Sequence, residues 1–375
     1  MHINFRTYRT IKVTLAQLLH TRANSHAEQH LNTLALLICG IVASQHVQFD
    51  KLASQAPIRG RKNESLITRF RRWVKHQDVS LETLWQPIAR SVLAALAKAE
   101  LTILLDGTTA GRGCVILMAS LLYRGHAIPL LWSVVKGKKG HLPQDVHCAL
   151  IARLQKLIGA DTTVTLLGDG EFDGTDLQAA LRKAKWDYVC RTASNILIFA
   201  HERVFTVADL PLSPGEAVSL AEVQMTAKQY GPVMLIGAWE KKQAEPLYLI
   251  TSLSDGNEAL SRYRLRFRIE CMFANHKSRG FRLDKSHLAD PARLSRLVIA
   301  TSLAYLWILA VAVFACAQGW IEQFHRKDRC DLGLYQIGLR AIQYALREGL
   351  RIPLSFLLPL DDPQTLLITN IFSVR

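Results

Sequence analysis

The spacing of apolar residues predicts helices in the first quarter of the chain. Residues 1 to about 98 contain an apolar helix at Ala27–Ser44 and a shorter helix at Phe49–Gln55. A turn-prone stretch then precedes a third helix at Glu64–His76, for which Asn63 is the expected N-cap. The first domain boundary is therefore placed near residue 98.

From Leu101 the pattern changes to short apolar runs alternating with helical segments. Strands are predicted at Leu101–Leu105, Val115–Tyr123, Ile128–Lys136, Thr163–Gly168 and Asp187–Arg191, and helices at Gln144–Ile158 and Thr175–Ala184. This order predicts a mixed sheet with helices packed on it. Residues 195–255 add β-rich runs separated by Pro, Gly and charged turns, which predicts a small β-rich insertion. Helical texture returns from about 259 to 350.

One helical segment is unusually apolar. Leu297–Ala317 runs for 21 residues without a charge, which is the length of a membrane span. Thr301 and Ser302 interrupt the run, and basic residues flank both of its ends, so neither side is clearly the positive one. A helix that is apolar all round can equally be buried in a large soluble core. We favour the buried helix and expect no membrane partner.

Charge indicates the kind of partner. The chain carries 46 Lys and Arg against 31 Asp and Glu, a net charge of +15. Residues 1–99 hold 14 of the basic residues and 5 of the acidic ones. A surplus of this kind most often serves nucleic-acid binding. The third predicted helix concentrates it in Arg69, Arg72 and Lys75, and Lys138 and Lys139 form a basic loop after the third strand. A merely solvated surface would show the same pattern.

Cysteine usage and the N-terminus argue for a cytoplasmic protein. The seven cysteines are scattered singly, without the spacing of a zinc site or of a disulfide framework. Such a set fits a reducing compartment. The first residues lack the apolar core and cleavage site of a signal peptide.

Two aspartates are candidates for metal ligation. Asp106 and Asp169 each follow an apolar run and precede glycine, which places each at the end of a predicted buried strand. Mg²⁺ is held well by one or two such carboxylates. Asp-Gly is also ordinary turn chemistry, and Glu171 is a rival ligand. An Asp-Gly-Thr string occurs in haloacid-dehalogenase phosphatases too, but their nucleophilic aspartate would stand where this chain has Leu104.

A third acidic residue lies in a patterned helix predicted within 261–277. At 100° per residue, Tyr263, Arg266, Glu270 and Lys277 fall within about 60° of one another. The opposite face is apolar and is expected to pack on the sheet through Leu265, Ile269 and Met272. A plain amphipathic surface helix with an Arg266–Glu270 ion pair is the alternative.

The spacing Tyr263-x2-Arg266-x3-Glu270-x6-Lys277 resembles the Tyr-Arg-Glu-Lys signature of DDE transposases of the insertion-sequence-four type. Together with Asp106 and Asp169, the resemblance covers roughly residues 60–345. It implies an α/β ribonuclease-H-like mixed sheet with flanking helices. It also implies that Asp106, Asp169 and Glu270 hold two Mg²⁺ ions, for which Mn²⁺ would substitute, and that the other three signature residues contact DNA.

The resemblance also implies an activity and partners. The expected reaction is cut-and-paste transposition through a DNA hairpin, on terminal inverted repeats and target DNA, by a homodimer in a synaptic complex. The implied setting is the bacterial cytoplasm and nucleoid. The alternative is a descendant that binds DNA without cleaving it. The chain departs from some relatives at Ala274, where they carry a second lysine. Relatives stack a flipped base on an aromatic side chain of the insertion, and either Trp239 or Tyr248 would take that role here.

These inferences divide the chain into five parts. They are a helical DNA-binding region (1–98), the catalytic core in two pieces (99–194 and 259–318, the second with the signature helix), the β-rich insertion (195–258) and a helical C-terminal region (319–375). Within the last part, Tyr335–Leu346 is the expected surface for pairing two protomers.

Overall fold

The structure is a computed structural model that describes residues 3–21, 25–58, 60–94, 100–140, 142–200, 203–326 and 331–357. The predicted boundary at residue 98 lies outside the described residues, as does the end of the predicted C-terminal region beyond 357.

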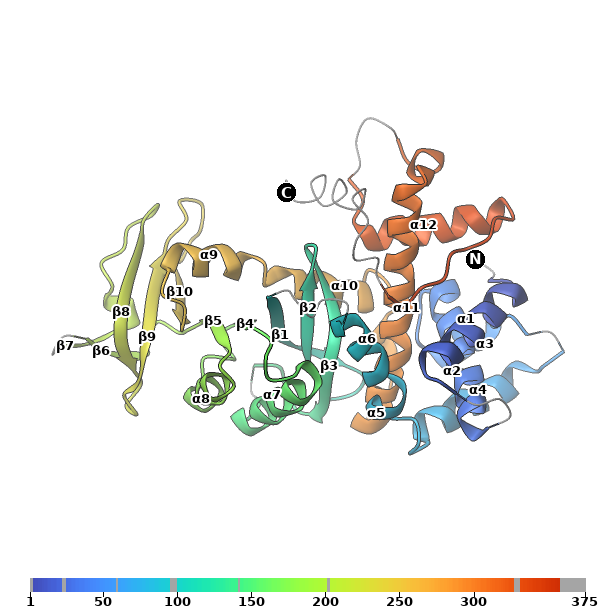
Figure 1. The fold of residues 1–375 in the computed structure, drawn as a ribbon, viewed down its shortest axis with the longest axis horizontal. Helices are drawn as coiled ribbons and strands as arrows, with labels where there is room; N and C mark the ends of the chain where they lie inside the picture. The colour runs from blue at the N-terminus through green and yellow to red at the C-terminus, as the bar shows by residue number, and fades with distance from the viewer. Residues whose placement is uncertain are drawn as a thin grey trace.

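The described residues form one mixed sheet of ten strands in the order β3-β2-β1-β4-β5-β10-β9-β8-β6-β7 (Figure 1). The strands are β1 (Leu101–Ala110), β2 (Cys114–Tyr123), β3 (His126–Lys136), β4 (Val164–Gly168), β5 (Asp187–Arg191), β6 (Leu197–Ala200), β7 (Arg203–Thr206), β8 (Ala217–Met225), β9 (Tyr230–Ala238) and β10 (Leu247–Thr251). β1, β4 and β5 run parallel to one another, and the remaining pairings are antiparallel.

The segment predicted as a β-rich insertion supplies β6 to β10. These strands do not form a separate sheet, because β10 pairs with β5 and so continues the sheet of β1–β5. The pairing of Ile250 with Cys190 lies in this junction, and both side chains are fully buried. The junction between the two halves of the sheet is thus part of the core.

Helices cover the sheet and form the rest of the molecule. They are α1 (Phe5–Leu18), α2 (His26–Ser44), α3 (Phe49–Ser54), α4 (Asn63–Lys75), α5 (Leu81–Leu84), α6 (Gln86–Ala94), α7 (Gln144–Ile158), α8 (Thr175–Lys183), α9 (Gly256–Arg264), α10 (Phe267–His276), α11 (Pro291–Ala317) and α12 (Leu334–Arg347). In Figure 1, α7 and α8 lie below the central strands and α9 and α10 above them, while α1 to α4 gather beside α11.

The apolar segment at Leu297–Ala317 forms most of α11. Asp290 caps this helix by accepting a hydrogen bond from the Arg293 amide at 2.8 Å. Within the described residues α11 is the one helix long and apolar enough to cross a membrane, and 94% of its most apolar window is buried inside the protein. It contacts α2, α4, α12 and β3, so it joins the N-terminal helices to the sheet.

The basic helix α4 differs from its prediction at the start. Asn63 is its first residue, and Lys62 stands at the N-cap without a side-chain hydrogen bond, so the predicted Asn63 cap is wrong. The helix packs through Leu66, Phe70, Trp73 and Val74. Its position on α2 is fixed by two hydrogen bonds, from the Trp73 indole to the His30 carbonyl at 3.0 Å and from Arg69 to the Thr33 hydroxyl at 2.8 Å.

Helix α12 contains the segment predicted to pair two protomers. Its apolar side already packs within the chain, against α11. The contact is so close that a Cβ added at Gly338 would lie 2.1 Å from the Ile308 carbonyl oxygen. A glycine is therefore required at this crossing.

Replacing Gly338 with alanine should destabilise the protein, although alanine favours helices. The added methyl forces α11 and α12 apart, and overpacking of this kind costs about 1–3 kcal/mol. Thermal and urea unfolding measure the loss. Gly333→Ala is the matched control, because a Cβ there meets nothing within 4 Å; equal losses in the two variants would contradict the close-crossing explanation.

Candidate active site

The pairing of β1 with β4 brings the two predicted aspartates together. Their parallel ladder ends at the pair Leu105 and Gly168, so the next residue on each strand is the aspartate, Asp106 or Asp169. The two carboxylates thus start from neighbouring backbone positions. Asp106 does not end its strand, however: β1 continues to Ala110 and Asp106 pairs with Met118 of β2, so the predicted strand end at Asp106 is wrong.

Asp106 is buried and surrounded by cations. Its side chain is 1% exposed; Oδ1 accepts a hydrogen bond from the Gly107 amide at 2.7 Å and lies 3.0 Å from Lys139 Nζ. Oδ2 lies 3.7 Å from an Arg266 guanidinium nitrogen and has no hydrogen-bond partner. Burial raises the pKa of Asp106 above its ordinary value, and Asp169 adds to the rise while Lys139 and Arg266 oppose it. The two cationic neighbours therefore offset the cost of burying this carboxylate only in part.

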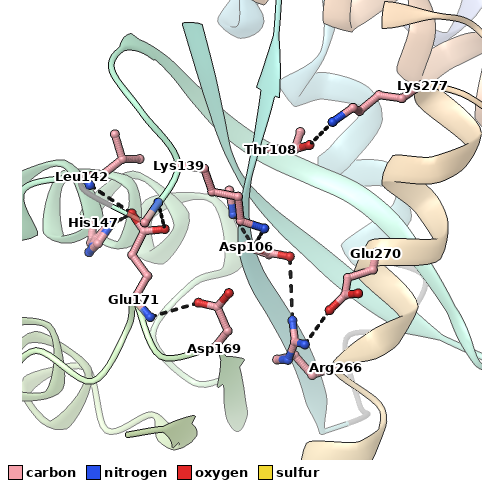
Figure 2. A network of polar contacts seen from close by, with 12 residues as sticks. Asp106, Thr108, Lys139, Leu142, His147, Asp169, Glu171, Arg266, Glu270 and Lys277 are labelled. Carbon is pink, nitrogen blue, oxygen red and sulfur yellow. Dashed lines mark hydrogen bonds and ion pairs between the residues drawn. The ribbon is translucent and has the colours of Figure 1, made fainter. Parts of the chain in front are cut away.

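Asp169 and Glu171 follow β4, and their carboxylates make different contacts. Asp169 is half-buried, and its Oδ1 accepts a hydrogen bond from the Glu171 amide at 3.1 Å. The Glu171 carboxylate points the other way, toward the basic loop after β3 (Figure 2). It accepts hydrogen bonds from the amides of Gly140 at 3.1 Å and Leu142 at 3.0 Å. Its oxygens hold this loop, so Glu171 is a loop anchor in this structure, and its role as a rival metal ligand stays a hypothesis.

A buried histidine completes the anchor. His147 of α7 is 1% exposed, and its Nε2 lies 3.7 Å from the Glu171 carboxylate. Burial alone would raise the pKa of Glu171, but the nearby His147 imidazole and the hydrogen bonds from the two loop amides outweigh it and lower the pKa. Glu171 is therefore held in its charged form, and the loop carrying Lys139 is fixed beside Asp106.

The helix predicted through 261–277 is broken in two. Helix α9 ends at Arg264 and α10 begins at Phe267, because the chain between them turns through tighter i to i+3 hydrogen bonds such as Arg266 N–H to the Tyr263 carbonyl. Leu265 is consequently 37% exposed, so its predicted packing on the sheet is wrong, whereas Ile269 and Met272 are buried as expected. Lys277 lies beyond the last helical residue.

Helix α9 is bound to β4 and to the residue before β1 through the side chain of Arg262. Arg262 donates hydrogen bonds to Glu100, just before β1, and to the Thr165 hydroxyl on β4 at 3.0 Å. An ion pair with Glu258 at 2.6 Å holds the same guanidinium within α9. Both aspartate-bearing strands are thus linked to the helices that carry the signature residues.

Arg266 connects Glu270 to Asp106. One guanidinium nitrogen contacts Glu270 Oε1 at 2.5 Å, and the other is the group that approaches Asp106 (Figure 2). The guanidinium also lies over the ring of buried Tyr263, 5.7 Å from its centroid. Despite the break in the helix, Arg266 therefore contacts Tyr263, Glu270 and Asp106. Glu270 is 42% exposed and has room to turn.

Lys277 reaches the same strand as Asp106 from the far end of α10. Its Nζ donates a hydrogen bond to the Thr108 hydroxyl at 3.1 Å. Thr108 lies two residues after Asp106 and so faces the same side of β1. Burial lowers the pKa of Lys277, and the charge of Lys139 acts in the same direction. Two of the four signature residues, Arg266 and Lys277, therefore contact the strand that bears the buried aspartate.

A cavity of about 530 Å³ adjoins Asp169. Tyr263, Arg266, Arg191 and Tyr248 are among the residues that line it. Arg191 was missed from the sequence, although a signal existed: it ends β5, which runs parallel to β4, so its side chain emerges at the same edge as Asp169. Trp239 does not line this cavity, and its indole donates to the Gln243 carbonyl at 3.1 Å.

The basic residues predicted on α4 lie apart from this edge. Arg69 and Arg72 line one cavity on the N-terminal helices, while Lys75 lines another, so the structure separates Lys75 from the other two. Lys138 is exposed in the anchored loop beside Lys139. The candidate DNA contacts thus form two groups, one at the carboxylates and one on α4.

Residues 102–307, more than half of the chain, match the family described as the transposase DDE domain. The protein belongs to this family. The resemblance to DDE transposases is thereby confirmed at the level of the family, while the insertion-sequence-four type stays a prediction. No curated protein matches this DDE transposase in sequence.

One similar solved structure is the cryo-EM structure of a piggyBac transposase synaptic complex with hairpin DNA. The identity is 14%, the match covers 98% of this chain and 82% of that one, and the TM-score is 0.45.

DDE transposases generally use divalent metal ions. The buried Asp106 oxygen without a hydrogen-bond partner and the raised pKa of that carboxyl fit a cation ligand. Among the described residues, however, the carboxylates of Asp106, Asp169 and Glu270 are not a group whose ligand atoms all lie within 4.8 Å. Arg266 bridges two of them, so ligation by all three requires Glu270 to leave that ion pair.

Replacing Glu171 with glutamine should loosen the loop of this DDE transposase. Glutamine has one acceptor oxygen where the carboxylate uses two, so one loop amide loses its partner at a cost of about 1–2 kcal/mol. Limited trypsin digestion should cut after Lys138 or Lys139 about tenfold faster. Glu245→Gln, at an exposed glutamate, is the control. An unchanged cutting rate in Glu171→Gln would contradict the anchor.

Proposed function

We propose that the protein is a cut-and-paste DNA transposase of the insertion-sequence-four type, in which Asp106, Asp169 and Glu270 are the catalytic carboxylates. The observation that carries the proposal is the register of β1 and β4, which sets the two aspartates side by side. The ion pairs of Arg266 with Asp106 and Glu270 support it, because they bring the third acidic residue to the same place.

Strands β1 to β5, with α7 and α8, would form a ribonuclease-H-like core. Their order β3-β2-β1-β4-β5, with β1, β4 and β5 parallel, supports this assignment. Strands β6 to β10 would be the insertion, which here extends the core sheet. We retain the helical regions 1–98 and 319–375 as the parts that would bind the element's ends and pair the protomers.

Two bound Mg²⁺ ions would activate the attacking water or 3′-hydroxyl and stabilise the departing oxygen of the phosphodiester. The chain's own residues would orient the DNA. Arg266 can grip a phosphate with two parallel N–H groups, while Lys139 and Lys277 offer point charges. Lys139 and Arg266 already lie beside Asp106, so a phosphate bound there would be within their reach.

One site of this kind can serve successive attacks on DNA. The proposed sequence is nicking at the terminal inverted repeat, hairpin formation on the element's end, hairpin opening and transfer to target DNA. Arg69 and Arg72, which line one surface cavity, and Lys75 on another face of α4 would hold DNA away from the cleavage point. Lys138 would act with Lys139 nearer to it.

Removing one carboxylate should abolish cleavage without abolishing DNA binding. In Asp106→Asn, Asp169→Asn or Glu270→Gln, nicking of an oligonucleotide carrying the element's own ends should fall at least about a thousandfold with Mg²⁺, because a lost metal ligand removes several kcal/mol of transition-state stabilisation. Gel-shift affinity for the same DNA should hold or rise, since each change removes a negative charge.

The matched control is Asp161→Asn, at an exposed aspartate outside the site, which should cleave normally. Specific end binding by the unaltered protein without any nicking would support the alternative, a non-catalytic DNA-binding descendant. Cleavage that survives all three substitutions would show that the carboxylates are assigned wrongly.

The cavity beside Asp169 favours Tyr248 over Trp239 as the aromatic that stacks a flipped base, because Tyr248 lines it together with Arg266. Tyr248→Ala should slow hairpin formation about tenfold, as a lost base stack costs about 1–3 kcal/mol, while Tyr248→Phe should retain the rate. Denaturing gels of end cleavage measure both. Equal rates in Tyr248→Ala and the unaltered protein, with Trp239→Ala slow, would reverse the assignment.

A further inference from the structure

Three metal-ligating side chains meet on the N-terminal helices, outside the proposed catalytic site. Within the described residues, His30, His76 and Asp78 form the group whose ligand atoms all lie within 4.8 Å of one another. The two imidazole rings are 4.4 Å apart between centroids, and His76 Nδ1 lies 3.8 Å from the Asp78 carboxylate. The cluster joins α2, which carries His30, to the turn that follows α4.

The backbone beneath each of these side chains is held in place. The His30 carbonyl accepts the hydrogen bond from the Trp73 indole, three residues before His76. Arg296 of α11 spans the turn. It donates to the carbonyl of Val74, before His76, at 3.0 Å and to that of Val79, after Asp78, at 2.7 Å. The stretch that carries His76 and Asp78 is therefore fixed at both ends to the buried helix, while both side chains remain exposed and able to turn.

We propose that His30, His76 and Asp78 bind a transition-metal ion, with Zn²⁺ as the best match, and that this ion ties α2 to the end of α4. Two imidazoles and one carboxylate are ligands that Zn²⁺ accepts in tetrahedral sites. Mg²⁺ and Ca²⁺ prefer oxygen ligands, so the ion differs in kind from those proposed at the carboxylates. Three protein ligands leave one position for water or another small ligand.

The position of this site connects it to the basic surface of α4. His30 and His76 line a cavity of about 440 Å³ together with Arg61, Arg69 and Arg72. One carboxylate and two neutral imidazoles would leave a bound divalent ion with a net positive charge at the rim of a cavity that is already basic. The site would thus stabilise the packing of α2 on α4 and strengthen the attraction of this surface for anions.

Zinc binding can be measured on the full chain carrying Asp106→Asn, Asp169→Asn and Glu270→Gln, so that the proposed catalytic carboxylates do not contribute. Competition with a chromogenic zinc chelator should give one tight site per chain. Adding His30→Ala or His76→Ala to that background should weaken Zn²⁺ binding by at least about tenfold, because even outer partners of a metal site contribute that much. Asp78→Asn should weaken it less than either histidine change.

His26→Ala is the matched control, because His26 is an exposed histidine one turn before His30 on the same helix. It should leave Zn²⁺ affinity unchanged. Unchanged melting temperatures in chelator would show that the variants fold like their parent. The absence of saturable zinc binding, or binding that persists in both His30→Ala and His76→Ala, would overturn the proposal and leave an ordinary histidine–aspartate contact.

A second measurement needs no variant. Diethyl pyrocarbonate modifies accessible imidazoles, and peptide mass spectrometry locates the modified residues. Saturating Zn²⁺ should protect His30 and His76 but not His26 or His287, both of which are exposed. Equal modification of all four histidines with and without zinc would contradict the site even if the substituted proteins proved unstable.

Discussion

The parallel ladder between β1 and β4 is the constraint on which the candidate active site depends. Its last pair, Leu105 and Gly168, fixes Asp106 and Asp169 as backbone neighbours, whatever the surrounding loops do. Two carboxylates brought together in this way repel each other, and burial raises the cost of charging Asp106. Positive charge next to the pair lowers that cost. Lys139 and Arg266 supply it, and the Glu171 anchor holds the loop that carries Lys139 in place.

Much of the sheet could be predicted from sequence, because its inner strands are continuous apolar runs bounded by turns. β5 and α7 match their predicted bounds, and β4 differs by one residue. The full length of β1 was missed, since Gly107, Thr108 and Thr109 give no apolar signal and are held in the strand by pairing with β2. Pairing partners far along the chain decide such cases, and a local pattern does not contain them.

The sequence predicted which residues belong to the candidate site better than it predicted how they are arranged in space. Periodicity grouped Tyr263, Arg266 and Glu270 correctly, but it assumed an unbroken helix, and the turn at Leu265 changes which residues face the sheet. Glu171 was considered as a ligand because it follows Asp169 closely. Its actual partners, the Gly140 and Leu142 amides, lie about thirty residues away, so its role depended on the folded loop.

The continuity of the sheet across β5 and β10 limits how this protein can move around a substrate. The Thr192 amide, just after β5, donates to the Tyr248 carbonyl at 3.0 Å, so two residues that line the cavity are joined across the adjoining strands. Arg182 of α8 adds a second attachment, to the carbonyls of Gly231 at 3.0 Å and Pro232 at 2.7 Å. A hinge between the two halves of the sheet would break both connections. Adjustment to a bound substrate would then fall to side chains such as Arg266 and Glu270, which the sheet does not hold directly.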